Sequence, residues 1–312
     1  MSGFDIIDAV HDLPHAPTAD RTFQESNLFV WHDLKAGTGG FWRLGQEVVK
    51  GELNSCFGVF TADGQRFRSN VTGVAMRPGD RGESHMGYGP ELRVDLDSLR
   101  LRADFPDCKA DLTFTDFFPR YDWFALLDRP GHASHHFENA GTMKGRIEIG
   151  GREIAVDALA YRDRSWGERS WDGLRATRWW PCVFGPDLVI FLTAAVHEEG
   201  SGAYGYMIRD GEPQTLRDVG ILSTLDWDAI TPRGGEGTFA LPDGARGLVR
   251  HEPSDGIVLH VRGYTAIESI GTARFGDRVG MSNFEACTNP AGGSLPPVLT
   301  LGANNGAGLG RR

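Results

Sequence analysis

Residues 146–160, RIEIGGREIAVDALA, decide the fold expected for this chain. Gly150 and Gly151 separate two runs in which apolar and polar residues alternate. A Gly-Gly pair readily adopts the positive φ angles that a two-residue hairpin turn requires. The stretch therefore predicts two antiparallel strands joined by a tight turn.

Similar signals recur along the rest of the chain. Residues 58–68 carry Asp63 and Gly64 between two extended runs, and residues 188–196, LVIFLTAAV, are apolar on both faces like a central strand. Residues 257–262 alternate again. No segment longer than about ten residues shows a convincing helical period. These patterns predict an all-β protein, built as a sandwich or a barrel.

The composition agrees with this fold class and excludes several functions. The 312 residues include 42 glycines, 18 phenylalanines and 8 tryptophans, which suit turns and strands better than helix interiors. A net charge of −10 argues against a non-specific nucleic-acid binder, which needs a basic surface. Residues 188–196 are too short to span a bilayer, and residues 1–20 lack the basic and apolar parts of a secretory signal. We therefore expect a cytoplasmic protein without a transmembrane segment. Contact with a membrane surface and the oligomeric state stay open.

The cysteines support the same compartment. Cys56, Cys108, Cys182 and Cys287 are far apart, so no CxxC zinc or redox spacing exists. We expect four scattered reduced thiols.

The most unusual segment is residues 161–180, YRDRSWGERSWDGLRATRWW, which follows the predicted hairpin. Alternation places Arg162 and Arg164 on the small, apolar face of the preceding strand, and Asp163 on the opposite face. A charge on an interior face is costly unless it is paired. Both arginines therefore need carboxylate partners or a ligand. An Arg/Asp network that pins the end of a barrel is the structural alternative.

A histidine cluster lies near the middle of the chain. Residues 131–141, GHASHHFENAG, hold His132, His135, His136 and Glu138. Neighbouring histidines face opposite sides of a strand, so the cluster does not predict a metal site. A single histidine acting as an acid or base, or an exposed loop, accounts for it more simply.

Residues 161–167, YRDRSWG, resemble the Tyr-His-Asp-His-Asn-Trp-Gly run of the carotenoid 1,2-hydratases (hydroxyneurosporene synthases) and AttH-like proteins. They are most similar to a bacterial branch with an Arg-Asp-Arg/His-Ser-Trp-Gly motif. The resemblance covers about residues 20 to 290. It implies two lipocalin-like (calycin-type) antiparallel β-barrels in tandem and a hydrophobic pocket. Members hydrate isoprenoid double bonds, and fungal relatives cyclise polyene chains.

The chain departs from this family at two positions. Arg162 and Arg164 replace the two histidines, and arginine does not shuttle protons at ordinary pH. Arginine is better suited to holding a carboxylate or a carbonyl oxygen. We therefore expect a cofactor-independent hydratase, isomerase or cyclase acting on a hydrophobic, oxygenated isoprenoid-, steroid- or polyketide-like substrate. A non-catalytic carrier of lipids or small hydrophobic molecules is the main alternative, and a carbohydrate-binding sandwich is a third.

These expectations assign roles to particular residues. The candidate catalytic residues are Asp163, Arg164, Arg169, His136 and Glu285. The candidate substrate-binding residues are Arg162, Tyr161, Trp166, Trp171, Trp179, Trp180 and Phe191. No metal and no cofactor are expected. The expected parts are an irregular leader at 1–20, barrels at 21–140 and 141–290, and a flexible tail at 291–312.

Overall fold

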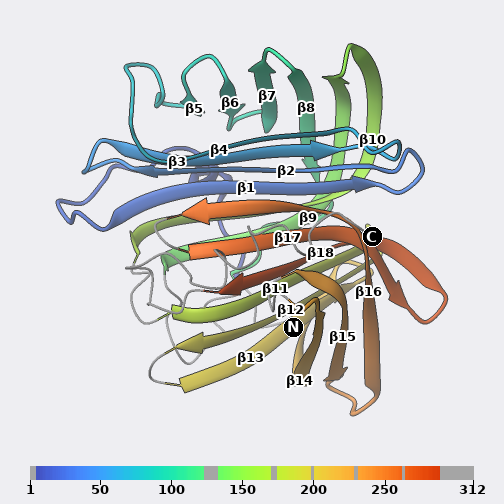
Figure 1. Cartoon of the computed structure of the whole chain (residues 1–312). Helices are drawn as coiled ribbons and strands as arrows, with labels where there is room; N and C mark the ends of the chain where they lie inside the picture. The colour runs from blue at the N-terminus through green and yellow to red at the C-terminus, as the bar shows by residue number, and fades with distance from the viewer. Residues whose placement is uncertain are drawn as a thin grey trace. The chain divides into compact units, whose positions relative to one another are not determined.

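Strands make up nearly all of the secondary structure. The computed structural model describes residues 5–122, 133–169, 174–197, 200–227, 231–261 and 264–288. The one helical element among them is the 3-10 turn η1 (Ala9–Asp12), so the all-β prediction is confirmed. No helix in these ranges is long and apolar enough to cross a membrane. The chain divides into two compact units, Gly3–Ser170 and Trp171–Arg312 (Figure 1).

The first unit is a ten-stranded antiparallel sheet (Figure 1). Its strands are β1 (Phe23–Asp33), β2 (Thr38–Glu47), β3 (Glu52–Phe60), β4 (Arg66–Ala75), β5 (His85–Tyr88), β6 (Leu92–Asp95), β7 (Arg100–Phe105), β8 (Cys108–Asp116), β9 (Ala133–Ile149) and β10 (Arg152–Arg169). Their order in the sheet is β4-β3-β2-β1-β10-β9-β8-β7-β6-β5. The sheet curls enough to bring its edge strand β5 to β2, where Gln46 donates from Nε2 to the Gly87 carbonyl at 3.2 Å.

The predicted Gly-Gly hairpin is the junction of β9 and β10. Gly150 and Gly151 have φ angles of 58° and 74°, as the tight turn requires. Both strands are longer than predicted, and β9 runs through the polar stretch expected to separate the domains. Because β9 also pairs with β8 and β10 with β1, both belong to the first unit. The division therefore falls after Ser170, and not near residue 140 as expected.

One face of β10 forms part of the core of the first unit. Val156, Ala158 and Ala160 pack with buried side chains of the curled sheet, among them Phe29 and Trp42. This is the small, apolar face that the alternation predicted.

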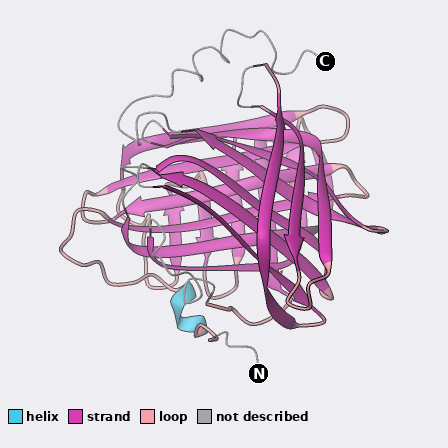
Figure 2. Cartoon of the chain, turned by 90° about the horizontal axis from the view of Figure 1, so that it is seen from below, coloured by secondary structure: helices cyan, strands magenta, loops and turns pink. Residues whose placement is uncertain are grey.

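Further along β10, the same face is closed by an ion-pair network. Arg162 contacts Asp12 of η1 at 2.6 Å and Asp116 at 2.9 Å, and Arg164 contacts Glu25 at 2.5 Å. Both arginines are fully buried, and carboxylates supply the partners that burial demands. Figure 2 shows η1 in cyan. The N-terminal segment, expected as an irregular leader, thus contributes to the buried network.

The second unit is a closed eight-stranded antiparallel barrel (Figure 1). Its strands are β11 (Leu174–Gly185), β12 (Leu188–His197), β13 (Gly200–Arg209), β14 (Glu212–Leu225), β15 (Pro232–Ala240), β16 (Arg246–Val261), β17 (Tyr264–Phe275) and β18 (Arg278–Thr288). Trp180, Phe239 and Phe284 fill its interior together with aliphatic side chains. A Cβ atom at Gly237 would lie 2.3 Å from Leu192 and 3.0 Å from Trp180, so packing is tight there. The four cysteines form no disulfide bonds, as predicted, and all four are buried.

Replacement by alanine is expected to destabilise the protein more at Gly145 on β9 than at Gly151 in the hairpin turn. Its φ is 146°, and a Cβ would lie 2.0 Å from the Asp111 carbonyl oxygen, whereas nothing lies within 4 Å of a Cβ at Gly151. Gly151→Ala should cost about 1–3 kcal/mol from backbone strain alone. Gly145→Ala should cost more, because the Asp111 backbone must also shift. Urea unfolding of both variants checks this order, and equal losses would contradict it.

Candidate active site

The opposite face of β10 carries polar side chains. Tyr161, Asp163 and Ser165 alternate with the buried arginines along the strand, as predicted. On the neighbouring strand β9, Glu138 lies directly opposite Asp163, and His136 lies opposite Ser165. The register of β9 and β10 therefore brings these side chains together on one face.

The centre of this cluster is a histidine between two carboxylates. His136 Nε2 lies 2.7 Å from Asp163 Oδ2 and 3.4 Å from Glu138 Oε1. Tyr161 donates its hydroxyl proton to Glu138 Oε2 at 2.7 Å. The side chains of His136 and Asp163 keep 14% and 19% of their exposure, whereas Glu138 keeps 4%. The pair is thus largely removed from water but can still be reached.

The surroundings of His136 and Asp163 favour the charged form of each side chain. Burial lowers the pKa of His136, but Asp163 and Glu138 outweigh it, so the pKa is raised above its ordinary 6.5. Burial raises the pKa of Asp163, but the His136 charge and hydrogen bond, with Arg169 and Arg43, hold that pKa below its ordinary 3.8. Both shifts favour the charged form of the pair, an imidazolium beside a carboxylate.

A reaction that needs this charged pair should have a broad pH profile. The rate should fall on the alkaline side as His136 loses its proton above pH 6.5, and on the acid side as Asp163 gains one below pH 3.8. The ion pair should stabilise the fold over the same window, because one pKa is raised and the other lowered. Rate–pH profiles of the wild type and His136→Gln test this. The alkaline limb should vanish in the variant, and its persistence would contradict the assignment.

A second polar group adjoins the pair. Arg169 donates from Nη1 to Ser165 Oγ at 3.2 Å and to Ser26 Oγ on β1 at 3.4 Å. The two serine oxygens are 2.8 Å apart. The first unit therefore brings together four of the predicted residues, namely Tyr161, Asp163, His136 and Arg169.

Three other predicted residues of the first unit lie on the opposite face. Arg162 and Arg164 are engaged in the buried ion pairs, which favours the structural alternative for them. Trp166 stacks on His15 and His135, with ring centroids 4.3 and 5.2 Å away. This arrangement is packing around the ion-pair network.

The remaining predicted residues belong to the second unit. Glu285 is buried and accepts a hydrogen bond from Thr177 Oγ1 at 2.6 Å. Trp179 lies opposite Glu285 in the register, and its ring is 6.1 Å from that of Phe191. Trp180 points into the barrel core. Trp171 lies outside the described residues, as does His132 of the histidine cluster.

Three side chains could together hold a metal ion. Ligand atoms of His136, Glu138 and Asp163 lie within 4.8 Å of one another. The 2.7 Å separation of His136 Nε2 and Asp163 Oδ2 is that of a direct charge-assisted hydrogen bond. The observed geometry is therefore that of an acid–base pair.

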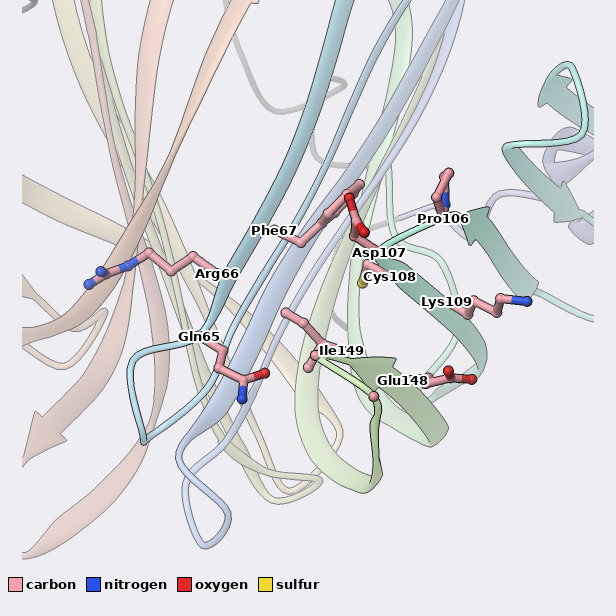
Figure 3. Close-up of a pocket in the computed structure, with 11 residues that line it drawn as sticks. Gln65, Arg66, Phe67, Pro106, Asp107, Cys108, Lys109, Glu148 and Ile149 are labelled. Carbon is pink, nitrogen blue, oxygen red and sulfur yellow. The ribbon is translucent and has the colours of Figure 1, made fainter.

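The first unit also has a cavity away from this cluster. It has a volume of about 580 Å³ and is lined by turns at one end of the sheet (Figure 3). Phe67, Cys108 and Ile149 form its apolar part, while Lys109 and Arg66 extend away from it (Figure 3). Burial and the nearby Glu148 raise the pKa of Cys108 to about 12, so this thiol stays protonated. The cavity lacks the paired acid and base of the cluster.

Several residues of the cluster were not predicted as functional. In the sequence, Glu138 stands out only as part of the histidine-rich stretch, and Ser165 only as part of the motif. Ser26 and Arg43 lie on β1 and β2, more than 100 positions before Asp163 on β10. The motif of residues 161–167 carries no signal for them.

The fold defines a class of protein with two lipocalin-like units in tandem. Within that class, the chain belongs to the family described as "Domain of unknown function (DUF7064)", whose model matches residues 8–290. No curated protein is significantly similar to it in sequence.

Solved structures support the predicted fold. A protein assigned as AttH from Nitrosomonas europaea is 14% identical, with a TM-score of 0.61 over 93% of this chain and 98% of that one. Kievitone hydratase from Nectria haematococca is 9% identical, with a TM-score of 0.63 over 93% and 95%. CghA, crystallised with Sch210972, is 12% identical, with a TM-score of 0.60 over 87% and 89%. The tandem lipocalin-like architecture is thereby confirmed, and the AttH resemblance is supported at the level of fold. The likeness to carotenoid 1,2-hydratases stays a prediction.

Proposed function

We propose that this protein is an enzyme that adds water to, or removes it from, a carbon–carbon double bond in a hydrophobic, oxygenated substrate, without a cofactor. The observation that carries the proposal is the 2.7 Å contact of His136 with Asp163, a charged pair that is largely buried and still reachable. Kievitone hydratase, which shares the fold, has the same class of reaction in its name.

The pair can supply both proton transfers of a hydration. Asp163, held as a carboxylate, takes a proton from water as the water oxygen bonds to one carbon. His136, held as an imidazolium, gives a proton to the other carbon. The proton on Asp163 then passes to His136 along their hydrogen bond, and the pair returns to its starting state. One water is consumed, one C–O and one C–H bond form, and the π bond breaks.

Glu138 and Tyr161 hold the His136–Asp163 pair in place. Glu138 contacts His136, and Tyr161 holds Glu138 through its hydroxyl. Double-bond isomerisation and proton-initiated cyclisation also use an acid and a base, so they are the other reactions that this cluster supports.

Native mass spectrometry of the purified protein tests whether a hydrophobic molecule is bound. The molecule released from the protein is then incubated with fresh protein in H₂¹⁸O, with heat-denatured protein as the control. A product heavier by one molecule of H₂¹⁸O, formed over many turnovers, is expected for a hydratase. Recovery of the molecule unchanged would instead identify a carrier and overturn the proposal.

A further inference from the structure

Two buried serines lie beside the acid–base pair. Ser26 on β1 and Ser165 on β10 stand directly opposite each other and are 3% and 4% exposed. Ser165 also lies opposite His136 on β9. The serine pair therefore occupies the row of the sheet next to the row that holds Asp163.

In the part of the chain that the structure describes, the hydrogen bonds of the two serines use only one of their two hydroxyl protons. Each hydroxyl has one proton to donate and can accept two. One proton lies in the 2.8 Å bond between Ser26 and Ser165, and Arg169 only donates to the two oxygens. Among the described residues, no acceptor receives the second hydroxyl proton. A buried donor without an acceptor is unfavourable, so binding of a molecule that supplies an acceptor is favoured.

The charges near the serines select an electron-rich acceptor. Arg169 and Arg43 are both close enough to lower the pKa of Asp163. Gly45 on β2 lies opposite Ser26, and a Cβ there would be 3.1 and 3.2 Å from the Arg43 guanidinium nitrogens. Arg43 thus extends over Gly45 on one side, and Arg169 reaches the serines directly. Two cations favour an oxygen that becomes negative during the reaction.

We propose that Ser26, Ser165 and Arg169 bind the carbonyl oxygen of the substrate, and that the substrate is an α,β-unsaturated carbonyl compound. This inference rests on the function proposed above. Ser165 lies two positions after Asp163 on β10, which corresponds to about 7 Å along the strand. Side chains that lean toward each other from these positions can contact the two ends of one short conjugated group.

The conjugated carbonyl changes the order of bond making in the hydration. Water bonds to the β-carbon as Asp163 takes its proton, and the π electrons move onto the carbonyl oxygen as an enolate. The serine hydroxyl and Arg169 stabilise that oxygen. His136 then protonates the α-carbon, the carbonyl re-forms, and Asp163 returns its proton to His136. The net change is the addition of one water.

The test uses β-ionone, a conjugated isoprenoid ketone, labelled with ¹³C at its carbonyl. Its binding is measured by calorimetry and its carbonyl stretch by isotope-edited infrared spectroscopy. The hydrocarbon with CH₂ in place of C=O serves as the comparison ligand, and Ser201→Ala, an exposed change, as the control variant. The wild type and Ser201→Ala should bind the ketone more tightly than the hydrocarbon and lower its carbonyl frequency.

The serine variants give the decisive result. Ser165→Ala and Ser26→Ala should each weaken ketone binding, by up to about tenfold, and shift the carbonyl band back toward its free position. Unchanged affinity and frequency in both variants, or no preference for the ketone in the wild type, would overturn the carbonyl site. Asp163→Asn should keep the band shift, because it removes the base and leaves the serines. The failure of the hydratase proposal is seen separately, as the absence of ¹⁸O incorporation.

Discussion

Asp163→Asn is expected to lower turnover by about 10²–10⁴-fold while the protein stays folded. An amide cannot take a proton from water, and it removes the charge that holds the pKa of His136 above its ordinary value. The measurement is the rate of ¹⁸O incorporation at saturating substrate, with circular dichroism and the melting temperature checking the fold.

The strand itself provides a matched control for this variant. Asp157 lies on the same side of β10, is 73% exposed and pairs only at the surface with Lys144. Asp157→Asn should leave the rate unchanged. The double variant Asp163→Asn/His136→Gln should be little slower than Asp163→Asn alone, because the two residues act as a unit. Wild-type turnover in Asp163→Asn would remove Asp163 from the mechanism, and fully additive losses would argue against a working pair.

Glu25→Gln is expected to cause the largest loss of stability, about 3–5 kcal/mol. The Glu25 carboxylate is fully buried and contacts Arg164 at 2.5 Å, His15 at 2.6 Å and Arg81. Neutralising it leaves buried positive charge without its partner. Chemical denaturation measures the loss, and Glu91→Gln, at an exposed ion pair with Arg77, should change stability by no more than about 1 kcal/mol.

The same residue predicts how stability depends on acid. Burial raises the pKa of Glu25, but the hydrogen bond from His15 and the charges of Arg164 and Arg81 lower it to about 2. A lowered carboxyl pKa stabilises the fold above the unfolded value of 4.5, and this contribution is lost as the pH falls toward 2. The difference in stability between the wild type and Glu25→Gln should therefore shrink between pH 4.5 and 2. A difference that stays constant over this range would contradict the assignment.

Local signals predicted much of the fold. The Gly-Gly turn marks the hairpin of β9 and β10, and the alternation along β10 separates Arg162 and Arg164 from Asp163 correctly. The predicted boundary near residue 140 is wrong, because a polar stretch resembles a loop in sequence even where its side chains line a polar site. β9 is polar at His136 and Glu138 because those residues face Asp163 and Tyr161.

The sequence by itself determined which side chains share a face of each strand, because the two-residue period of a β-strand is a local property. It could not determine which strands lie side by side. Asp12 pairs with Arg162 across 150 positions, and this contact depends on where the N-terminal segment folds back. Ser26 faces Ser165 across 139 positions, and this contact depends on the register of β10 against β1. Only the tertiary structure decides these contacts, since they form when distant segments bury their charges together. The same physical reason makes Arg162 and Arg164 part of the scaffold. Arg169 and Arg43 lie on the side of the acid–base pair.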